Sequence, residues 1–368
     1  MIAPASEAEL AEAVRSASGP LAIRGGGTRP LARACPGTVL SVAGLTGIVL
    51  YEPQTLTLVA RAGTPLDEIE AALAAEGQRL PFEPPDWRAL LGAPGRPTIG
   101  GAIAANASGP RRVQAGAARD SLIGLRAVDG TGTVIRNGGR TMKNVTGYDL
   151  ARLMAGARGT LGVLTEVSLK LLPAAGAVAT LIVPAPDAAA AVAAMTAALT
   201  SPYDVTGAAW LPGTGALIRI EGLAASVAYR AGRLAGRLGA AHVERDPEVS
   251  ARIWRDVAGA APLRDRPGDL WRFSIRPSQA PGVAARLGVP VVLDWGGGLV
   301  WAVLPAGTDA RARARPYSGH ATLMRTAAPG AAPAVPVLEP ESPAVAALSR
   351  GLRARFDPRG ILNAGLMD

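Results

Sequence analysis

Residues 141–173, TMKNVTGYDLARLMAGARGTLGVLTEVSLKLLP, are the most informative stretch of this 368-residue sequence. They predict a short helix at 149–155, a loop with glycines at 156, 159 and 162, and an apolar strand at 163–172. Glycine has no Cβ, so the backbone amides of such a loop can come within hydrogen-bonding distance of a bulky ligand. A structural turn between helix and strand is the alternative, and two further glycine-rich turns argue against it.

These two turns lie earlier in the chain. Residues 24–28, RGGGT, follow a predicted strand at 21–23, and residues 98–101, TIGG, follow a proline-rich loop at 83–97. RGGGT does not match the G-x-G-x-x-G fingerprint of dinucleotide-binding turns, because Pro30 takes the place of the third glycine and no helix follows. Successive N–H groups at such turns form anion-binding nests. A ligand with two phosphates and two large aromatic ends could therefore use all three loops.

Composition limits the chemistry. The net charge is +9, but the 36 Arg and 2 Lys are scattered without interleaved aromatics, so nucleic acid is not expected as a partner, although a basic patch for an acidic protein remains open. The single Cys excludes an iron–sulfur cluster, which needs about four thiolates, and two isolated His argue against a metal site. In a redox protein of this composition an organic cofactor must carry the electrons.

The rest of the sequence predicts an α+β organisation. Strands at 39–42 and 57–61 enclose a turn at Pro53, and a helix begins at Pro65 with Thr64 as its N-cap. A hairpin spans 122–136. Further strands are predicted at 178–183, 207–211, 216–220, 272–275, 291–295 and 299–304, with helices at 187–199, 223–238 and 343–355. The sequence shows no secretory signal and no transmembrane stretch, so a cytoplasmic protein is expected.

The order GYDL, GxxGTLGV and LKLxP within residues 141–173 resembles the signature of FAD-linked oxidases of the vanillyl-alcohol oxidase / p-cresol methylhydroxylase (PCMH) type. The resemblance implies a PCMH-type FAD-binding domain at 1–173, an α+β cap domain at 174–340, and a segment at 341–368 that returns to the FAD domain. It places cofactor contacts at Arg24, Gly25, Gly26, Gly27 and Thr28; at Thr98, Gly100, Gly101 and Ser108; at Gly159, Thr160, Gly162, Leu164 and Val167; and at Asn363. Family members that bind FAD covalently usually carry His in the first loop. Here Thr28 stands there, so non-covalent FAD is expected.

Longer strings are similar, in order, to the E-subunit family of bacterial glycolate dehydrogenases. They include SGPRR (108–112), GAARDSLIGLR (116–126), LWRFSI (270–275), LDWGGG (293–298), SGHATLMR (318–325) and FDPRGILNAG (356–365). The tail departs from the family pattern, since Ala364 and Leu366 replace the usual Pro and Arg. The resemblance implies an FAD-binding subunit of a complex that oxidises a small 2-hydroxy acid, glycolate to glyoxylate. An FAD-containing catalytic D-type subunit and an iron–sulfur F-type subunit would be its partners, and through them it could be peripheral to the inner membrane.

Two residues are candidates for catalysis. His320 could take a hydroxyl proton near neutral pH, or it is a strand histidine with a local hydrogen bond. Lys143 is one of only two lysines and could stabilise negative charge at the flavin edge, or it is a surface residue before a turn. The H-x-G-D-G-N-x-H motif of catalytic 2-hydroxyacid dehydrogenases is absent, so another subunit could be the chief site of oxidation. A self-sufficient FAD oxidoreductase for another substrate and a non-catalytic scaffold subunit remain as alternatives.

Overall fold

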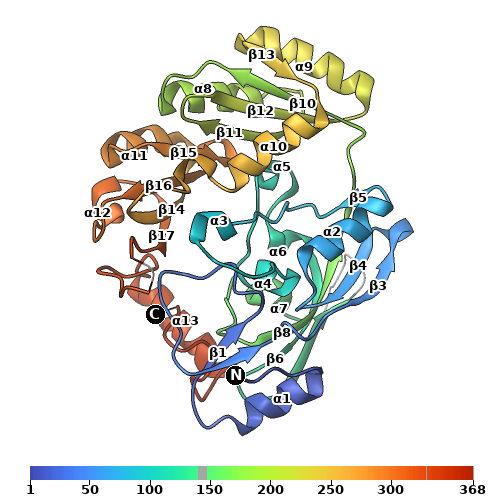
Figure 1. Ribbon diagram of the computed structural model, residues 1–368, viewed down its shortest axis with the longest axis vertical. Coiled ribbons are helices and arrows are strands. Elements are labelled where there is room, and N and C mark those ends of the chain that lie inside the picture. The colour runs from blue at the N-terminus through green and yellow to red at the C-terminus, as the bar shows by residue number, and fades with distance from the viewer. Residues whose placement is uncertain (140–146, 329, 368) are drawn as a thin grey trace.

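The computed structural model describes residues 1–139, 147–328 and 330–367, so the candidate Lys143 lies outside the described residues. The chain forms two parts, each built around its own sheet (Figure 1). No helix in the described part of the chain is both long enough and apolar enough to cross a membrane.

The first part holds the elements up to residue 173. Its strands are β1 (Leu21–Arg24), β2 (Thr38–Ser41), β3 (Ile48–Glu52), β4 (Thr57–Arg61), β5 (Gln78–Arg79), β6 (Leu122–Val128), β7 (Val134–Gly138), β8 (Val163–Lys170) and β9 (Leu172–Pro173). Its helices are α1 (Glu7–Ser16), α2 (Leu66–Ala75), α3 (Arg88–Leu91), α4 (Ile99–Ala104), α5 (Arg112–Ala115), α6 (Ala118–Ser121) and α7 (Leu150–Met154), with a 3-10 turn η1 (Pro53–Thr55). An antiparallel five-stranded sheet in the order β3-β4-β8-β6-β7 is its centre, and α2, α4 and α7 supply residues to the core on it.

The second part follows residue 173. Its strands are β10 (Ala177–Val183), β11 (Val205–Leu211), β12 (Gly215–Gly222), β13 (His242–Glu244), β14 (Asp269–Ile275), β15 (Val291–Asp294), β16 (Leu299–Leu304) and β17 (Gly319–Arg325). Its helices are α8 (Ala188–Leu199), α9 (Ala224–Leu238), α10 (Pro247–Ala258), α11 (Ala280–Leu287) and α12 (Ala310–Ala314), with 3-10 turns η2 (Ala261–Leu263), η3 (Pro277–Gln279) and η4 (Trp295–Gly297). The strands form one antiparallel sheet in the order β13-β10-β12-β11-β15-β16-β14-β17.

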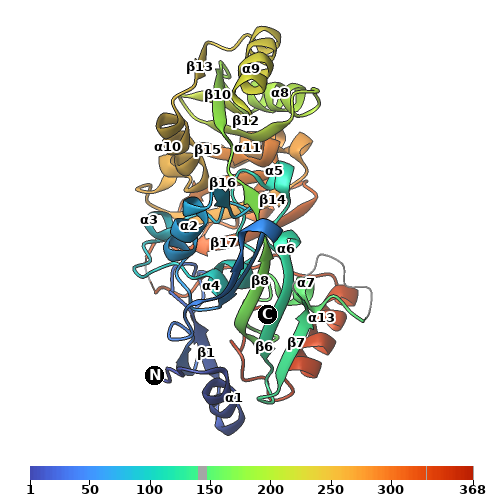
Figure 2. The ribbon, with the colours of Figure 1, turned by 90° about the vertical axis from the view of Figure 1, so that its right-hand side faces the viewer.

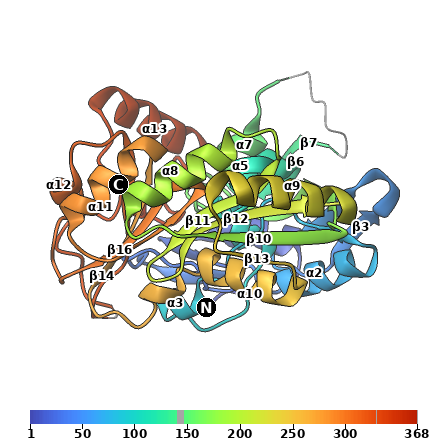
Figure 3. The ribbon, with the colours of Figure 1, turned by 90° about the horizontal axis from the view of Figure 1, so that it is seen from above.

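The two faces of the eight-stranded sheet have different roles. One face is covered by α8, α9, α11 and α12 (Figure 3), and the buried residues of the core between them all come from this part. The other face packs its tryptophans and leucines against residues of the first part, among them Trp87 and Leu90 beside Trp301. Because this second core takes side chains from both parts, it fixes how they lie against each other.

A cluster of buried ions also joins the two parts. Glu83 and Arg111 of the first part meet Arg219 and Glu221 of β12, with 2.8 Å between Arg219 Nη2 and Glu83 Oε2 and an ion pair between Arg111 and Glu221. Arg79 adds a contact of 3.0 Å to Glu221. Burial alone would raise the pKa of Glu221, but Arg219, Arg111 and Arg79 outweigh it and hold this pKa at about 2. The carboxylate is therefore charged throughout the physiological range.

The last helix, α13 (Pro343–Phe356), and the residues after it lie on the first part of the chain, beside β6 and β7 (Figure 2). Phe356 packs against the core of the five-stranded sheet, and its carbonyl accepts a hydrogen bond of 2.8 Å from the N–H of Gly130. Ile361 and Leu362 join α1, β1 and β2 in a small separate core. Residues 356–362 thus pack beside the start of the chain.

Several local predictions were wrong. Residues 39–42 do not pair with 57–61: β2 pairs in parallel with β1, and β4 pairs with β3, which the sequence pattern did not predict. Thr64 does not cap α2, because its hydroxyl donates to the carbonyl of Arg61 at 2.7 Å and the N-cap is Pro65. The proline-rich stretch predicted as loop contains the short helix α3.

The TIGG stretch is not a loop either. Thr98 caps α4 by accepting a hydrogen bond from the N–H of Gly101, so Gly100 and Gly101 lie in the first turn of a helix. A Cβ at Gly100 would lie 2.6 Å from the Cβ of Ala62. Glycine at position 100 is therefore required for α4 to lie on the segment that follows β4.

Candidate functional site

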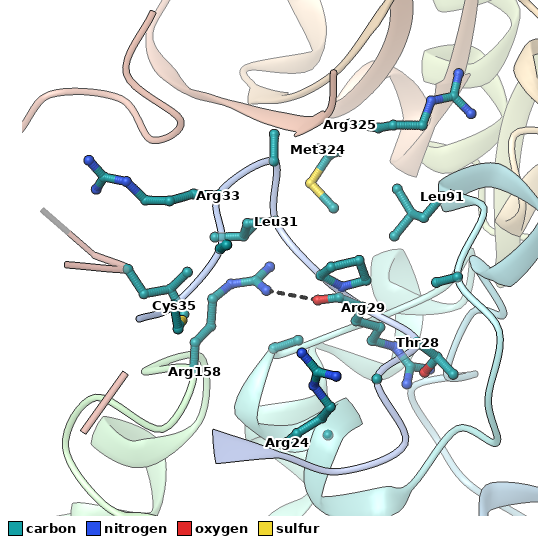
Figure 4. A pocket seen from close by; sticks show the side chains of 18 of the residues that line it. Arg24, Thr28, Arg29, Leu31, Arg33, Cys35, Leu91, Arg158, Met324 and Arg325 are labelled. Atoms are coloured by element: carbon teal, nitrogen blue, oxygen red, sulfur yellow. Dashed lines mark hydrogen bonds between the residues drawn. The ribbon is translucent and has the colours of Figure 1, made fainter. Parts of the chain in front are cut away.

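A cavity of about 1370 Å³ lies where the first part of the chain meets the edge of the eight-stranded sheet. Its walls come from the loop after β1, from α4, from the loop between α7 and β8, and from residues around the ends of β14 and β17. Figure 4 shows side chains of the loop after β1, among them Arg29, on one side, with Met324 and Arg325 of β17 across from them. The three glycine-rich segments of the sequence thus meet at one hollow.

Most of the predicted cofactor residues line this cavity. They are Arg24, Gly25, Gly26, Gly27, Thr28, Thr98, Gly100, Gly101, Gly159, Gly162, Leu164 and Asn363. Three predicted residues do not line it. Ser108 is buried and its hydroxyl accepts from the N–H of Ala118; the Thr160 hydroxyl donates to the carbonyl of Ala157; and Val167, a residue of β8, is fully buried in the core of the first part. All three residues are buried and lie outside the cavity lining.

The glycines of the first loop line the cavity and also allow this loop to pack closely against residues 96–98. A Cβ at Gly26 would lie 1.7 Å from the carbonyl oxygen of Arg96, and one at Gly25 would lie 2.7 Å from the hydroxyl of Thr98. Gly27 has φ +68°, which disfavours other residues. Glycines 25 and 26 are thus explained by close contact with residues 96–98, whereas the prediction relied on close approach to a ligand alone.

Asn363 joins two of the cavity-lining segments. Its side-chain oxygen accepts from the N–H of Ile23 in β1, and its amide nitrogen donates to the carbonyl of Arg158 in the third loop, both at 2.7 Å. Its own N–H donates to the carbonyl of Leu21 at 2.9 Å. A single side chain from the tail therefore sets the distance between the strand that leads into the first loop and the third loop.

Several arginines of the cavity were not predicted from the sequence, and two of them are in contact with each other. Arg29 and Arg158 both line it, and Arg158 donates to the carbonyl of Arg29 (Figure 4). Burial lowers the pKa of each guanidinium to about 10; Asp86 and Glu70 oppose this effect at Arg29, whereas the charge of Arg29 adds to it at Arg158. Nε and Nη1 of Arg29 are buried without a hydrogen-bond partner among the described residues.

The unpaired buried donors of Arg29, next to the like charge of Arg158, are unfavourable by themselves, and an anion would satisfy them. The cavity therefore fits a large ligand with phosphate groups, since cationic side chains and glycine backbone share its wall. No group of three or more His, Cys, Asp and Glu able to hold a metal ion occurs in the described ranges.

His320 does not line the cavity. It lies near the start of β17, opposite Ser274 of β14, and the residue as a whole is exposed. Partial burial of the imidazole lowers its pKa, and the nearby Arg272 guanidinium lowers it further. The side chain is therefore neutral at pH 7, as a proton acceptor must be. The other histidine, His242, lies in β13 at the far edge of the sheet, away from the cavity.

Comparisons with known proteins agree with this geometry. Residues 1–138 match the model of the FAD binding domain family. The glycolate oxidase subunit GlcE of Escherichia coli (strain K12) is 36% identical over 354 residues, which cover 95% of this chain and 92% of that protein. The glycolate oxidase subunit GlcD of Bacillus subtilis (strain 168) is 37% identical over 157 residues, which cover 42% of this chain and only 32% of that protein.

Among solved structures, an alkyldihydroxyacetonephosphate synthase superposes over 99% of this chain and 75% of its own, with a TM-score of 0.70 and 16% identity. At that identity the likeness is evidence for the fold alone. Together with the FAD-binding domain match it confirms the predicted α+β fold of the FAD-linked oxidases.

Proposed function

Because the chain belongs to the family of the glycolate oxidase subunit GlcE, we propose that it is the FAD-binding subunit of a complex that oxidises a small 2-hydroxy acid, glycolate in the first instance. FAD-dependent oxidation of hydroxy acids is the common activity of this family and of its GlcD and D-lactate dehydrogenase relatives. The observation that carries the proposal for this chain is the cavity, in which three glycine-bearing segments and two half-buried arginines surround one hollow.

We assign the cavity to FAD held without a covalent bond. Residues 25–28 and Gly101 would offer backbone and hydroxyl groups to the phosphates, and Arg29 and Arg158 would neutralise their charge. Gly159, Gly162 and Leu164 would pack against the rest of the cofactor. When bound, FAD supplies the two-electron acceptor that the side chains of the protein lack.

His320 is our candidate for the residue that takes the substrate hydroxyl proton, since its lowered pKa leaves Nε2 or Nδ1 free to accept it. Lys143, our second candidate for catalysis, lies outside the described residues. The single cysteine leaves no iron–sulfur relay within the chain, so any iron–sulfur step must take place in a partner. We propose a catalytic D-type subunit and an iron–sulfur F-type subunit as those partners.

A visible spectrum of the purified chain tests the first step. Peaks of oxidised flavin with close to one FAD per chain are expected, and a colourless protein that also fails to take up added FAD would refute the proposal. An acceptor-linked assay with glycolate, with and without the two partner subunits, tests the second step. Activity that appears only with the partners separates a subunit from a self-sufficient oxidase, in which the chain alone would sustain turnover.

A further inference from the structure

A second group of arginines lies at the boundary between the two parts of the chain. Arg272 is on β14 and Arg112 is on α5, and both guanidinium groups lie on the indole of Trp295. The guanidinium carbon of Arg112 is 4.4 Å from the ring centroid, and that of Arg272 is 5.2 Å from it. Figure 2 shows α5 beside the eight-stranded sheet, so each part of the chain contributes one of the two charges.

Arg272 sits in a cage of indoles. Besides Trp295, the rings of Trp301 and Trp87 have their centroids 5.9 Å and 6.0 Å from its guanidinium carbon. Its Nε is buried and has no hydrogen-bond partner, and within the described ranges the side chain forms no ion pair. The aromatic faces stabilise the cation in part, but they offer no oxygen to its N–H groups.

The carboxylate that influences Arg272 does not pair with it. Asp294 accepts a hydrogen bond of 2.7 Å from the N–H of Trp295, and burial raises its pKa to about 7. The other groups around Arg272 are basic: burial, Arg112 and Arg158 together lower the pKa of Arg272 to about 9. Arg272 and Arg112 also act on His320, whose pKa they lower.

A half-buried cationic group that is crowded by like charge and has a buried donor without a partner is unfavourable in the free protein. An anion bound to the Arg272 guanidinium would satisfy its donors and offset the positive charge, which explains the arrangement. The planar fork of an arginine matches the two oxygens of a carboxylate, and the surrounding indole rings suit a small organic monoanion better than a strongly hydrated one.

We propose that Arg272, with Arg112 beside it, binds the carboxylate of the 2-hydroxy acid at the boundary between the two parts of the chain. The inference rests on the proposed function for its substrate class. Arg158 lies in the cavity wall and is close enough to Arg272 to lower its pKa, and Arg272 is close enough to His320 to lower the pKa of that residue. A substrate held by Arg272 would therefore be near both the cavity wall at Arg158 and the candidate base.

Titration calorimetry of the FAD-loaded chain with glycolate tests this directly, with ethylene glycol as a neutral probe of the same size. Glycolate should bind and ethylene glycol should not. Arg272→Met should weaken glycolate binding by about tenfold or more, since a charge-assisted hydrogen bond is lost. Arg272→Lys should restore part of it. Arg276→Met, an exposed arginine just past the end of the same strand, is the matched control and should bind as wild type does.

Thermal unfolding of the same variants separates binding from a structural role. Removal of an unpaired buried charge should leave the midpoint of Arg272→Met unchanged or raise it, whereas an arginine needed for packing would lower it. Glycolate binding that is equal in Arg272→Met and wild type, or absent from wild type, would overturn the inference. FAD content is read separately by absorbance, so a loss of flavin would count against the proposed function and not against this site.

Discussion

We expect Gly101→Val to remove FAD from the protein without unfolding it. Gly101 is the third residue of α4, lines the cavity and has an ordinary helical backbone. A Cβ at this position would meet only one atom of the remaining protein within 4 Å, the hydroxyl oxygen of Thr98 at 3.1 Å. The two additional methyl groups of valine would therefore project into the space that we assign to the cofactor.

The effect on stability should be small. Valine has a better helix propensity than glycine by a few tenths of a kcal/mol, which offsets the small shift that the Thr98 hydroxyl must make. The effect on binding should be larger, because two methyl groups forced into a close contact typically cost about 1–3 kcal/mol. That corresponds to an increase in Kd of about 5- to 150-fold. After purification in the absence of added FAD the variant should be colourless.

The assay compares flavin absorbance per chain and the midpoint of thermal unfolding in wild type, Gly101→Val and a control. Gly236→Val is the matched control, because Gly236 is a helical glycine in α9 whose Cβ, if it had one, would meet no other atom within 4 Å. We expect the control to keep both its flavin and its midpoint. Full FAD content in Gly101→Val would refute the assignment of this wall. Gly162→Val should also lose FAD, but its Cβ would lie 3.2 Å from the carbonyl of Val128, so a change in folding would accompany the loss.

Four further outcomes are expected. Acid precipitation should release all yellow colour into the supernatant; colour in the pellet that disappears in Cys35→Ser would show a covalent link to this cavity-lining thiol. Arg29→Met should weaken FAD binding about tenfold or more, as measured by equilibrium titration of the apoprotein. The chain alone should oxidise glycolate weakly or not at all; sustained turnover that His320→Ala abolishes while FAD stays bound would support the self-sufficient enzyme. The pKa of Glu221 in the folded protein is about 2, below its ordinary 4.5, so this residue stabilises the fold above pH 4.5 and loses that contribution as the pH falls towards 2. Glu221→Gln should lower the free energy of unfolding at pH 7 by about 3–5 kcal/mol and flatten this acid dependence. Denaturant titrations at several pH values measure both effects.

The glycine-rich segments could be predicted from the sequence because close backbone approach requires glycine at particular positions, and glycine is visible in the sequence. Arg29, Arg158 and Arg272 belong to no comparable sequence pattern. The sequence has 36 arginines, and only their partial burial in the folded protein distinguishes these three from arginines in solvent. Their burial depends on contacts between distant segments, which periodicity does not report.

Strand pairing shows the same limit. β3 is the edge strand of its sheet and all its residues are exposed or half-buried, so it lacks the alternation by which a strand is recognised. The parallel pair β1–β2 is joined by the cavity loop and not by a crossover helix, which is an unusual connection for parallel strands. A prediction from local pattern therefore paired β2 with the wrong partner.

The hydrogen bonds of Asn363 have a consequence for biosynthesis. This residue ties β1, at the start of the chain, to the third glycine loop, so the cavity keeps its shape only when the tail is in place. A ribosome-bound chain that has not yet released residue 363 cannot hold the cofactor in its final geometry. We expect cofactor loading to follow synthesis of residue 363, and a chain cut just before this residue to release bound cofactor while the remainder stays folded. The flavin content of a preparation would then report the fraction of molecules that retain residue 363.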